Sequence, residues 1–279
     1  MSSSSLANSP TSSTTFYPLA KTYWRHSSSS LVIRSDHDTR IASFPLEFIR
    51  QGGDNTWSYV LYVVRQLVVL EPGQLGQLQD ENGAALDLNE APEAGTFRFH
   101  IEGSQSDVTF STGPEYFSRF KAPNPVGSIS TRSDSKRSSI NQSSFRALLL
   151  ARDGCCLISG VDHELCTSAH IVPYSRPDLY ERFYEDLGAM FLPSSGLVLR
   201  DDLHHAFDRL MLSFYEKDGF LFVHFFSLSH SDAAKWHGKM ISPDFFRGDP
   251  TKRPDPILLH WHYNQCVKAR MRGFSVGML

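Results

Sequence analysis

The chain has 279 residues, of which 41% are apolar and 20% are charged, and its formal net charge is −3 at pH 7. This composition is typical of a soluble globular protein. No apolar run reaches the roughly 20 residues that a membrane helix needs, and the N-terminus lacks the hydrophobic centre of a secretory signal. The four cysteines do not form a dense disulfide framework, so we expect an intracellular protein of the nucleus or cytoplasm with no membrane partner.

The charge is distributed unevenly along the chain. Residues 153–234 carry a net charge of −8, and they are flanked by +6 in residues 119–152 and +5 in residues 235–279. Acidic residues beside a cation site, with basic arms for phosphates, would suit a metal-dependent enzyme that acts on a polyanion. Chance clustering of ordinary surface charge is the alternative, and on charge alone we favour it.

The N-terminal part divides into a tail and a folded unit. Residues 1–30 are rich in Ser and Thr and are expected to be disordered. Residues 31–118 predict a small α+β unit with short strands, a hairpin turn at Asn82-Gly83 and an amphipathic helix in "DNTWSYVLYVVRQLVVL". Asp54 or Asn55 is the expected N-cap of that helix. Nothing in this unit indicates a particular chemistry.

A basic segment rich in Ser and Pro, residues 119–143, is predicted to be a linker to a second folded unit at residues 144–279. That unit begins with a short helix in "SFRALLLARDG", with Ser144 near its cap. A short strand precedes His170, and the strand "GLVL" leads directly into the helix "DDLHHAFDRL". A hairpin with Asp218-Gly219 at its turn follows, and the last helix begins at Asp255-Pro256. The fold class is therefore α+β.

Two histidine-containing stretches carry the candidate chemistry. His204 and Asp208 are four residues apart in a predicted helix, so they lie on one face and suit a divalent metal ion. His205 points about 100° away from that face. His170, at a strand end before Pro173, is suited to taking a proton from water. Alone, it would more often be a buried structural histidine.

These stretches together, "RDGCCLISG…CTSAHIVPYSR…SSGLVLRDDLHHAFDR", resemble the HNH endonuclease motif on the ββα-metal fold. The branch common among uncharacterised fungal proteins is the most similar, because "HGKMISPDFFRGDP" and "PDPILLHWHYNQCVKARMRG" follow the motif. The resemblance covers residues 144–273, and it implies a small N-terminal α+β unit followed by an HNH nuclease-like domain.

The resemblance assigns roles to individual residues. His170 matches the general base and His204 matches the metal ligand, with Asp208 available as a second ligand one helical turn later. Ser195 stands where the family has an Asn that braces the loop carrying the base, and a hydroxyl replaces the amide only in part. Ala169 stands where relatives often have a metal-binding Asp or His. These two departures put the strength of metal binding and the activity in doubt.

Further residues are weighed as phosphate or metal contacts. Arg200, Lys268, Arg270 and Arg272 are candidates for binding nucleic-acid phosphates, although the last three would equally complement a helix C-terminus. Cys156, His163 and Cys166 lack the paired spacing of a structural zinc site, so buried free thiols are the preferred interpretation.

The sequence thus predicts a metal-dependent HNH endonuclease that hydrolyses phosphodiester bonds in DNA, with Mg²⁺, Mn²⁺ or Zn²⁺ as its ion and no small-molecule cofactor. Two alternatives stay open. One is a catalytically weakened HNH-fold module that binds nucleic acid or regulates. The other is a protein-interaction module whose functional part is the N-terminal unit.

Overall fold

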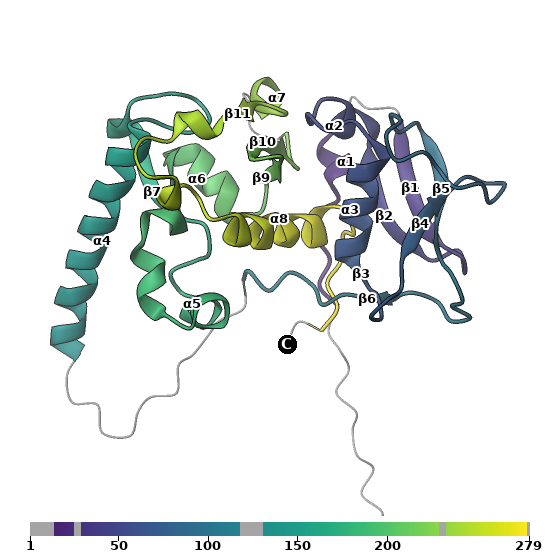
Figure 1. Ribbon diagram of the computed structural model, residues 1–279, viewed down its shortest axis with the longest axis horizontal. Helices are drawn as coiled ribbons and strands as arrows, with labels where there is room; N and C mark the ends of the chain where they lie inside the picture. The colour runs from purple at the N-terminus through teal and green to yellow at the C-terminus, as the bar shows by residue number, and fades with distance from the viewer. Residues whose placement is uncertain (1–13, 25–28, 118–130, 229–232, 278–279) are drawn as a thin grey trace, which may run out of the picture.

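A computed structural model describes residues 14–24, 29–117, 131–228 and 233–277 (Figure 1). Residues 119–130 of the predicted linker and residues 1–13 and 25–28 of the predicted tail lie outside these ranges. Part of the predicted tail is folded, however: the short helix α1 (Ala20–Tyr23) is followed by Trp24, which is buried and whose indole N–H donates to the Phe225 carbonyl. The expectation of disorder is thus wrong for residues 14–24.

The N-terminal half is built on a four-stranded sheet in the order β2-β1-β5-β4. Its strands β1 and β5 are parallel and the other pairs are antiparallel. The elements of this half are α1, β1 (Ser30–Ser35), β2 (Arg40–Pro45), α2 (Leu46–Arg50), α3 (Trp57–Leu67), β3 (Val68–Val69), β4 (Gly76–Gln79), β5 (Gly95–Ile101) and β6 (Thr109–Phe110).

Helix α3 packs its apolar side against this sheet. Trp57, Val60 and Val64 are buried on it at helical spacing. Its N-cap is Thr56, whose hydroxyl oxygen accepts from the Tyr59 N–H, and not Asp54 or Asn55 as expected.

The C-terminal half holds the predicted strand-strand-helix unit and a second sheet, in the order β11-β10-β9. Its elements are α4 (Thr131–Asp153), η1 (His163–Leu165), β7 (Cys166–His170), α5 (Pro177–Tyr184), η2 (Leu187–Phe191), η3 (Pro193–Ser195), β8 (Gly196–Arg200), α6 (Asp201–Asp208), β9 (Leu212–Lys217), β10 (Phe220–Phe225), α7 (Ala233–Trp236), β11 (Met240–Ile241), η4 (Pro243–Phe245), η5 (Pro250–Lys252) and α8 (Pro256–Arg270).

Local sequence signals account for most of these elements. Asp218 and Gly219 both have positive φ angles and close the β9–β10 hairpin where it was predicted. Asp255 caps α8 by accepting from the Ile257 N–H. Helix α4 differs, because it begins at Thr131, 13 residues before Ser144, within the segment predicted to be a linker.

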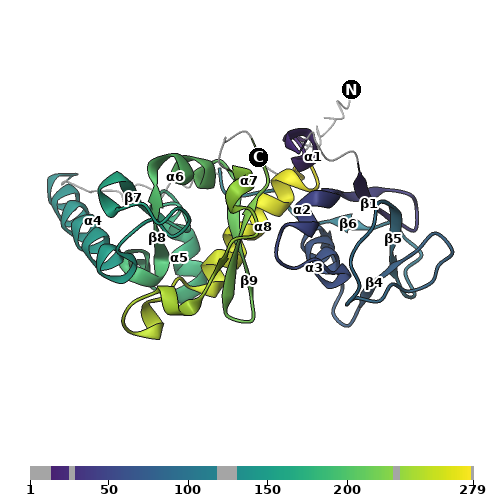
Figure 2. The same ribbon diagram turned by 90° about the horizontal axis from the view of Figure 1, so that it is seen from above.

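Helix α8 lies between the two halves in both views (Figures 1 and 2). It packs against β9 on one side and α3 on the other. A buried cluster of hydroxyl and imidazole groups joins the halves: the Tyr263 hydroxyl is 2.7 Å from both the Tyr59 hydroxyl and His224 Nδ1. His224 Nε2 is 2.7 Å from the Gly52 carbonyl oxygen. The two halves therefore share one core.

The segment after α8 completes the N-terminal half. The Ser43 N–H donates to the Met271 carbonyl, and the Gly113 N–H donates to the Val276 carbonyl. The Ser275 N–H donates to the Thr15 carbonyl at 2.8 Å. Residues more than 150 positions apart in sequence are thereby held together by backbone hydrogen bonds. No helix in the described ranges is long and apolar enough to span a membrane.

Candidate active site

The strand-strand-helix unit places the two histidine stretches next to each other. Strands β7 and β8 are antiparallel, with His170 opposite Gly196, and β8 runs directly into α6. The start of α6 is tied to β7, because the Thr167 hydroxyl donates to Asp201 at 2.5 Å. Helix α6 therefore rises beside the strand that ends at His170.

His170 sits in an aromatic environment. Its ring stacks on Phe145 with centroids 4.3 Å apart and planes inclined by 18°, and Tyr174 lies on another side at 5.9 Å. Gly196 makes this stacking possible, since a Cβ there would lie 2.3 Å from the Phe145 ring. Helix α4, which carries Phe145, therefore fixes the plane of the imidazole.

The two ring nitrogens of His170 have different surroundings. One nitrogen donates to the Met190 carbonyl, while Nε2 is buried and has no partner among the described residues. The donor is therefore Nδ1, and Nε2 carries the free lone pair. This is the tautomer that a general base needs.

Burial keeps the His170 ring neutral. Desolvation lowers its pKa to about 4; the hydrogen bond to Met190 acts in the opposite direction, and the nearby charge of His204 lowers the pKa further. His204 is thus close enough to affect the titration of His170. At neutral pH the His170 ring is thus unprotonated.

Ser195 supports the segment that holds His170. Its side chain is buried, and its hydroxyl donates to the Ala189 carbonyl at 2.6 Å. Ala189 and Met190 belong to the same turn, η2. The Ile171 N–H also donates to the Ser195 carbonyl at 2.9 Å. Ser195 thus contacts both the residue after His170 and the turn that orients its ring.

His204 and Asp208 face each other along one side of α6, as their spacing predicted. Asp208 Oδ2 is 3.2 Å from His204 Nε2, and both side chains are partly exposed. The other carboxylate oxygen, Oδ1, accepts from the Tyr116 hydroxyl at 3.0 Å. Tyr116 is buried and packs its ring on Trp261. One oxygen of Asp208 is thereby fixed and the other is turned toward His204.

This pair fits part of a metal coordination shell. Two donors at right angles, each about 2.1 Å from an ion, lie about 3.0 Å apart, close to the 3.2 Å between His204 Nε2 and Asp208 Oδ2. Among the described residues, no group of three or more His, Cys, Asp or Glu could hold an ion. His204 and Asp208 alone would therefore supply two ligands of such a shell.

Comparison with known proteins identifies the segment that carries this geometry. Residues 156–215 match the family model described as HNH endonuclease. The chain contains an HNH domain. The matched segment includes His170, Ser195, His204 and Asp208. Neither the search of the curated proteins nor the search of the solved structures gave a match.

The matched domain gives the function only in outline. HNH nucleases typically use a divalent metal ion, and an HNH domain indicates nuclease-type activity on nucleic acid. In this HNH domain Ala169 is buried in the core, so the position before His170 provides no ligand. His205 is exposed on α6, with its ring 5.9 Å from that of His204.

Two of the predicted phosphate contacts are used inside the fold. Arg272 is 1% exposed and donates to the Ser111 and Phe274 carbonyls. Arg270 is 8% exposed and donates to the Leu210 and Arg209 carbonyls. Their burial corrects the expectation that they contact nucleic acid, because carbonyls of the protein already occupy these guanidinium groups.

The other two predicted phosphate contacts, Lys268 and Arg200, are less accessible to a phosphate than expected. Lys268 is half-buried, and desolvation lowers its pKa. Arg200 donates twice to Asp202, at 2.7 and 2.8 Å, and lies 5.0 Å from the centre of the Trp236 ring. A phosphate would have to compete with Asp202 for this guanidinium.

The cysteines of the HNH domain have structural contacts. Cys156 Sγ accepts from the Ser159 and Arg200 N–H groups, and Cys166 Sγ donates to the Asp162 carbonyl at 3.3 Å. Both are buried free thiols, in agreement with the preferred interpretation. His163 pairs with Asp162.

Sequence reasoning missed Phe145, Met190 and Tyr116. Met190 acts through its backbone carbonyl, which no residue type encodes. Tyr116 lies 92 residues from Asp208 in the chain, so no local spacing connects them. Phe145 alone left a signal, as an apolar residue four positions before Leu149 on a helix.

Proposed function

We propose that this protein is a metal-dependent HNH endonuclease that hydrolyses phosphodiester bonds in DNA. The observation that carries the proposal is the state of His170: Nδ1 is bound to the Met190 carbonyl, Nε2 is without a partner among the described residues, and His204 is near enough to affect the pKa of the ring. This arrangement, within a matched HNH segment, is what base-assisted attack of water on a phosphate requires.

In the proposed reaction His170 Nε2 takes a proton from a water molecule, whose oxygen forms the new bond to phosphorus as the P–O bond to the leaving sugar breaks. The imidazolium that results keeps its Nδ1–H bond to Met190, which stabilises the charge. His204 and Asp208 would hold a divalent ion. When bound, that ion supplies positive charge beside the phosphate and the leaving oxygen.

Plasmid nicking tests the proposal. Purified protein is incubated with supercoiled plasmid and Mg²⁺, Mn²⁺ or Zn²⁺. Removing a general base costs a factor of about 10² to 10⁴, so we expect His170→Ala to lower the rate by at least about 100-fold. His205→Ala is the matched control, because it removes an exposed imidazole of α6 that points about 100° away from the face shared by His204 and Asp208. Wild-type nicking no faster than that of His170→Ala would overturn the proposal.

A second function is favoured by one specific observation. His170 Nε2 is buried, so water must gain access to it. Among the described residues, His204 and Asp208 are the two metal ligands that the site offers. An HNH-fold module that binds nucleic acid without cutting it would keep this geometry. Binding to DNA that weakens steeply with salt and survives both His170→Ala and His204→Ala, without nicking, would support this alternative.

A further inference from the structure

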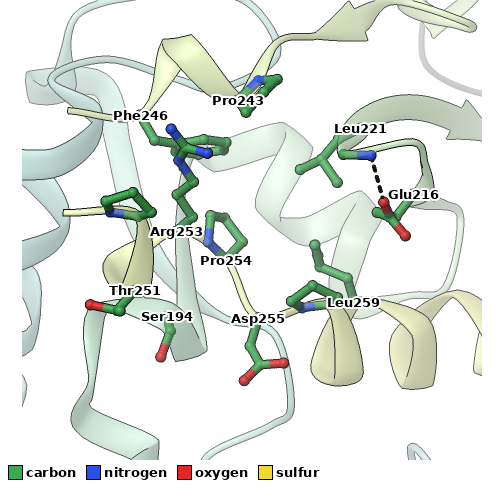
Figure 3. Close-up of a pocket in the computed structure, with 13 residues that line it drawn as sticks. Ser194, Glu216, Leu221, Pro243, Phe246, Thr251, Arg253, Pro254, Asp255 and Leu259 are labelled. Carbon is green, nitrogen blue, oxygen red and sulfur yellow. Dashed lines mark hydrogen bonds between the residues drawn. The ribbon is translucent and has the colours of Figure 1, made fainter. Parts of the chain in front are cut away.

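A pocket of about 400 Å³ lies away from the catalytic histidines, between the β9–β10 hairpin, the segment from η4 to η5, and the start of α8 (Figure 3). Its volume falls in the range of about 300–1,000 Å³ that is typical of small-molecule sites. None of His170, His204 and Asp208 lines it. The pocket is thus a separate feature of the fold.

Apolar side chains form most of the wall. Figure 3 shows Phe246 and Pro254 on one side and Leu221 and Leu259 on the other, with Pro243 above. Phe246 and Leu259 belong to the buried core, so their positions are fixed by packing. The flat faces of Phe246 and the prolines suit a compact planar group.

Arg253 is a polar residue of this wall whose side chain has no described hydrogen-bond partner. Its guanidinium forms no hydrogen bond or ion pair with any residue that the structure describes, and its Nε atom is buried. Arg152 and Arg270, by contrast, each donate to several protein oxygens. Arg272 also has one buried nitrogen without a described partner, Nη2, but its Nε and Nη1 atoms donate to carbonyls. A buried donor without a partner in a native fold calls for an explanation such as a ligand.

The acidic residues of the lining do not provide that partner. Asp255 uses one carboxylate oxygen to accept from the Ile257 N–H and the other to accept from the Tyr184 hydroxyl. Glu216 is exposed, and its Oε1 accepts from the Gly219 N–H. Both carboxylates thus accept from donors of their own, whereas the Arg253 guanidinium has no acceptor among the described residues.

We infer that this pocket binds a small organic anion, with a planar apolar body against Phe246 and Leu221 and one carboxylate or phosphate group on the Arg253 guanidinium. Guanidinium pairs with both oxyanions through two parallel hydrogen bonds. The inference does not depend on nuclease activity, because His170, His204 and Asp208 do not line the pocket.

Binding of probe anions to the full chain tests the inference without DNA or metal. The probes are 2-naphthoate and 2-naphthyl phosphate, and the neutral control is 2-naphthalenemethanol, each followed by calorimetric titration. We expect at least one anion to bind with a Kd below about 1 mM and at least tenfold more tightly than the alcohol. The tighter anion identifies the oxyanion as carboxylate or phosphate.

Three variants locate the site. Arg253→Gln should weaken the preferred anion at least tenfold and leave the alcohol unchanged, without lowering Tm, since the guanidinium has no described partner to lose. Arg247→Gln, an exposed arginine outside the pocket, is the matched control and should bind as wild type. Leu221→Trp should fill the cavity and weaken all three probes. Equal binding of anion and alcohol, equal binding by Arg253→Gln and wild type, or no binding at all would each overturn the inference.

Discussion

Replacing Ser195 by Ala tests how the fold orients His170. The substitution removes one hydrogen bond, from the Ser195 hydroxyl to the Ala189 carbonyl at 2.6 Å, and keeps the backbone bonds of residue 195. The Ala189 carbonyl still accepts from the Leu192 N–H at 3.1 Å, so it is not left without a partner. The cost is therefore about 1 kcal/mol rather than the larger penalty of an orphaned buried group.

That energy sets limits on two measurements. For a chain of this size, about 1 kcal/mol corresponds to a fall in Tm of roughly 2–4 °C. The same energy changes by about fivefold the ratio of molecules in which η2 is held in place to molecules in which it is released. The nicking rate of Ser195→Ala should therefore fall by no more than about fivefold, far less than that of His170→Ala, because η2 carries the Met190 carbonyl that holds Nδ1.

The assay combines thermal unfolding, plasmid nicking and ¹⁵N NMR of the His170 ring. We expect the Nδ1–H signal of wild type to be partly lost in Ser195→Ala. Ser194→Ala is the control, because it removes a neighbouring hydroxyl that has no hydrogen bond to any described residue. If Ser195→Ala lowers Tm but leaves both the ring tautomer and the nicking rate unchanged, the reasoning that links Ser195 to His170 is refuted.

Two further predictions concern the His204–Asp208 pair and the buried histidines. Tyr116→Phe keeps the aromatic ring but removes the donor to Asp208, so Mn²⁺ affinity, measured by electron paramagnetic resonance of the free ion, should fall about tenfold; unchanged affinity would contradict this. Burial lowers the pKa of His224 to about 4 and of His237 and His262 to about 3. Because the unfolded chain takes up protons below pH 6.5 and the folded one does not, these three groups should together lower the free energy of unfolding by about 4 kcal/mol from pH 7.5 to 5.5, and His170, whose pKa is also about 4, should lower it by about 1 kcal/mol more. Urea unfolding followed by tryptophan fluorescence measures it, and a pH-independent value would argue against neutral buried imidazoles.

Local patterns predicted the strand-strand-helix unit and the hairpin because short-range geometry determines them. A four-residue spacing puts His204 and Asp208 on one helix face, and Asp218-Gly219 specifies the turn between two strands. The start of α4 was missed for the opposite reason: residues 131–143 are polar and rich in Ser, so their composition favours a linker over a helix.

Contacts between distant segments could not be predicted in the same way. Arg270 and Arg272 have the sequence context of exposed cations at a helix end, and only the tertiary fold surrounds them with carbonyls from Leu67, Ser111 and Leu210. Tyr116 reaches Asp208 for the same reason. The residues of the HNH motif in the candidate site could thus be predicted from the sequence. The residues that orient them could not, because tertiary contacts bring them to the site.

The backbone bonds between the C-terminal segment and the N-terminal half also affect how the chain can fold during synthesis. Val276, which accepts from the Gly113 N–H, leaves the ribosome about 160 residues later than its partner. At about 5–20 residues per second this delay is roughly 8–30 s. During that time the sheet formed by β1, β2, β4 and β5 lacks part of its covering, so the nascent N-terminal half would be a natural client for chaperones that shield apolar surface.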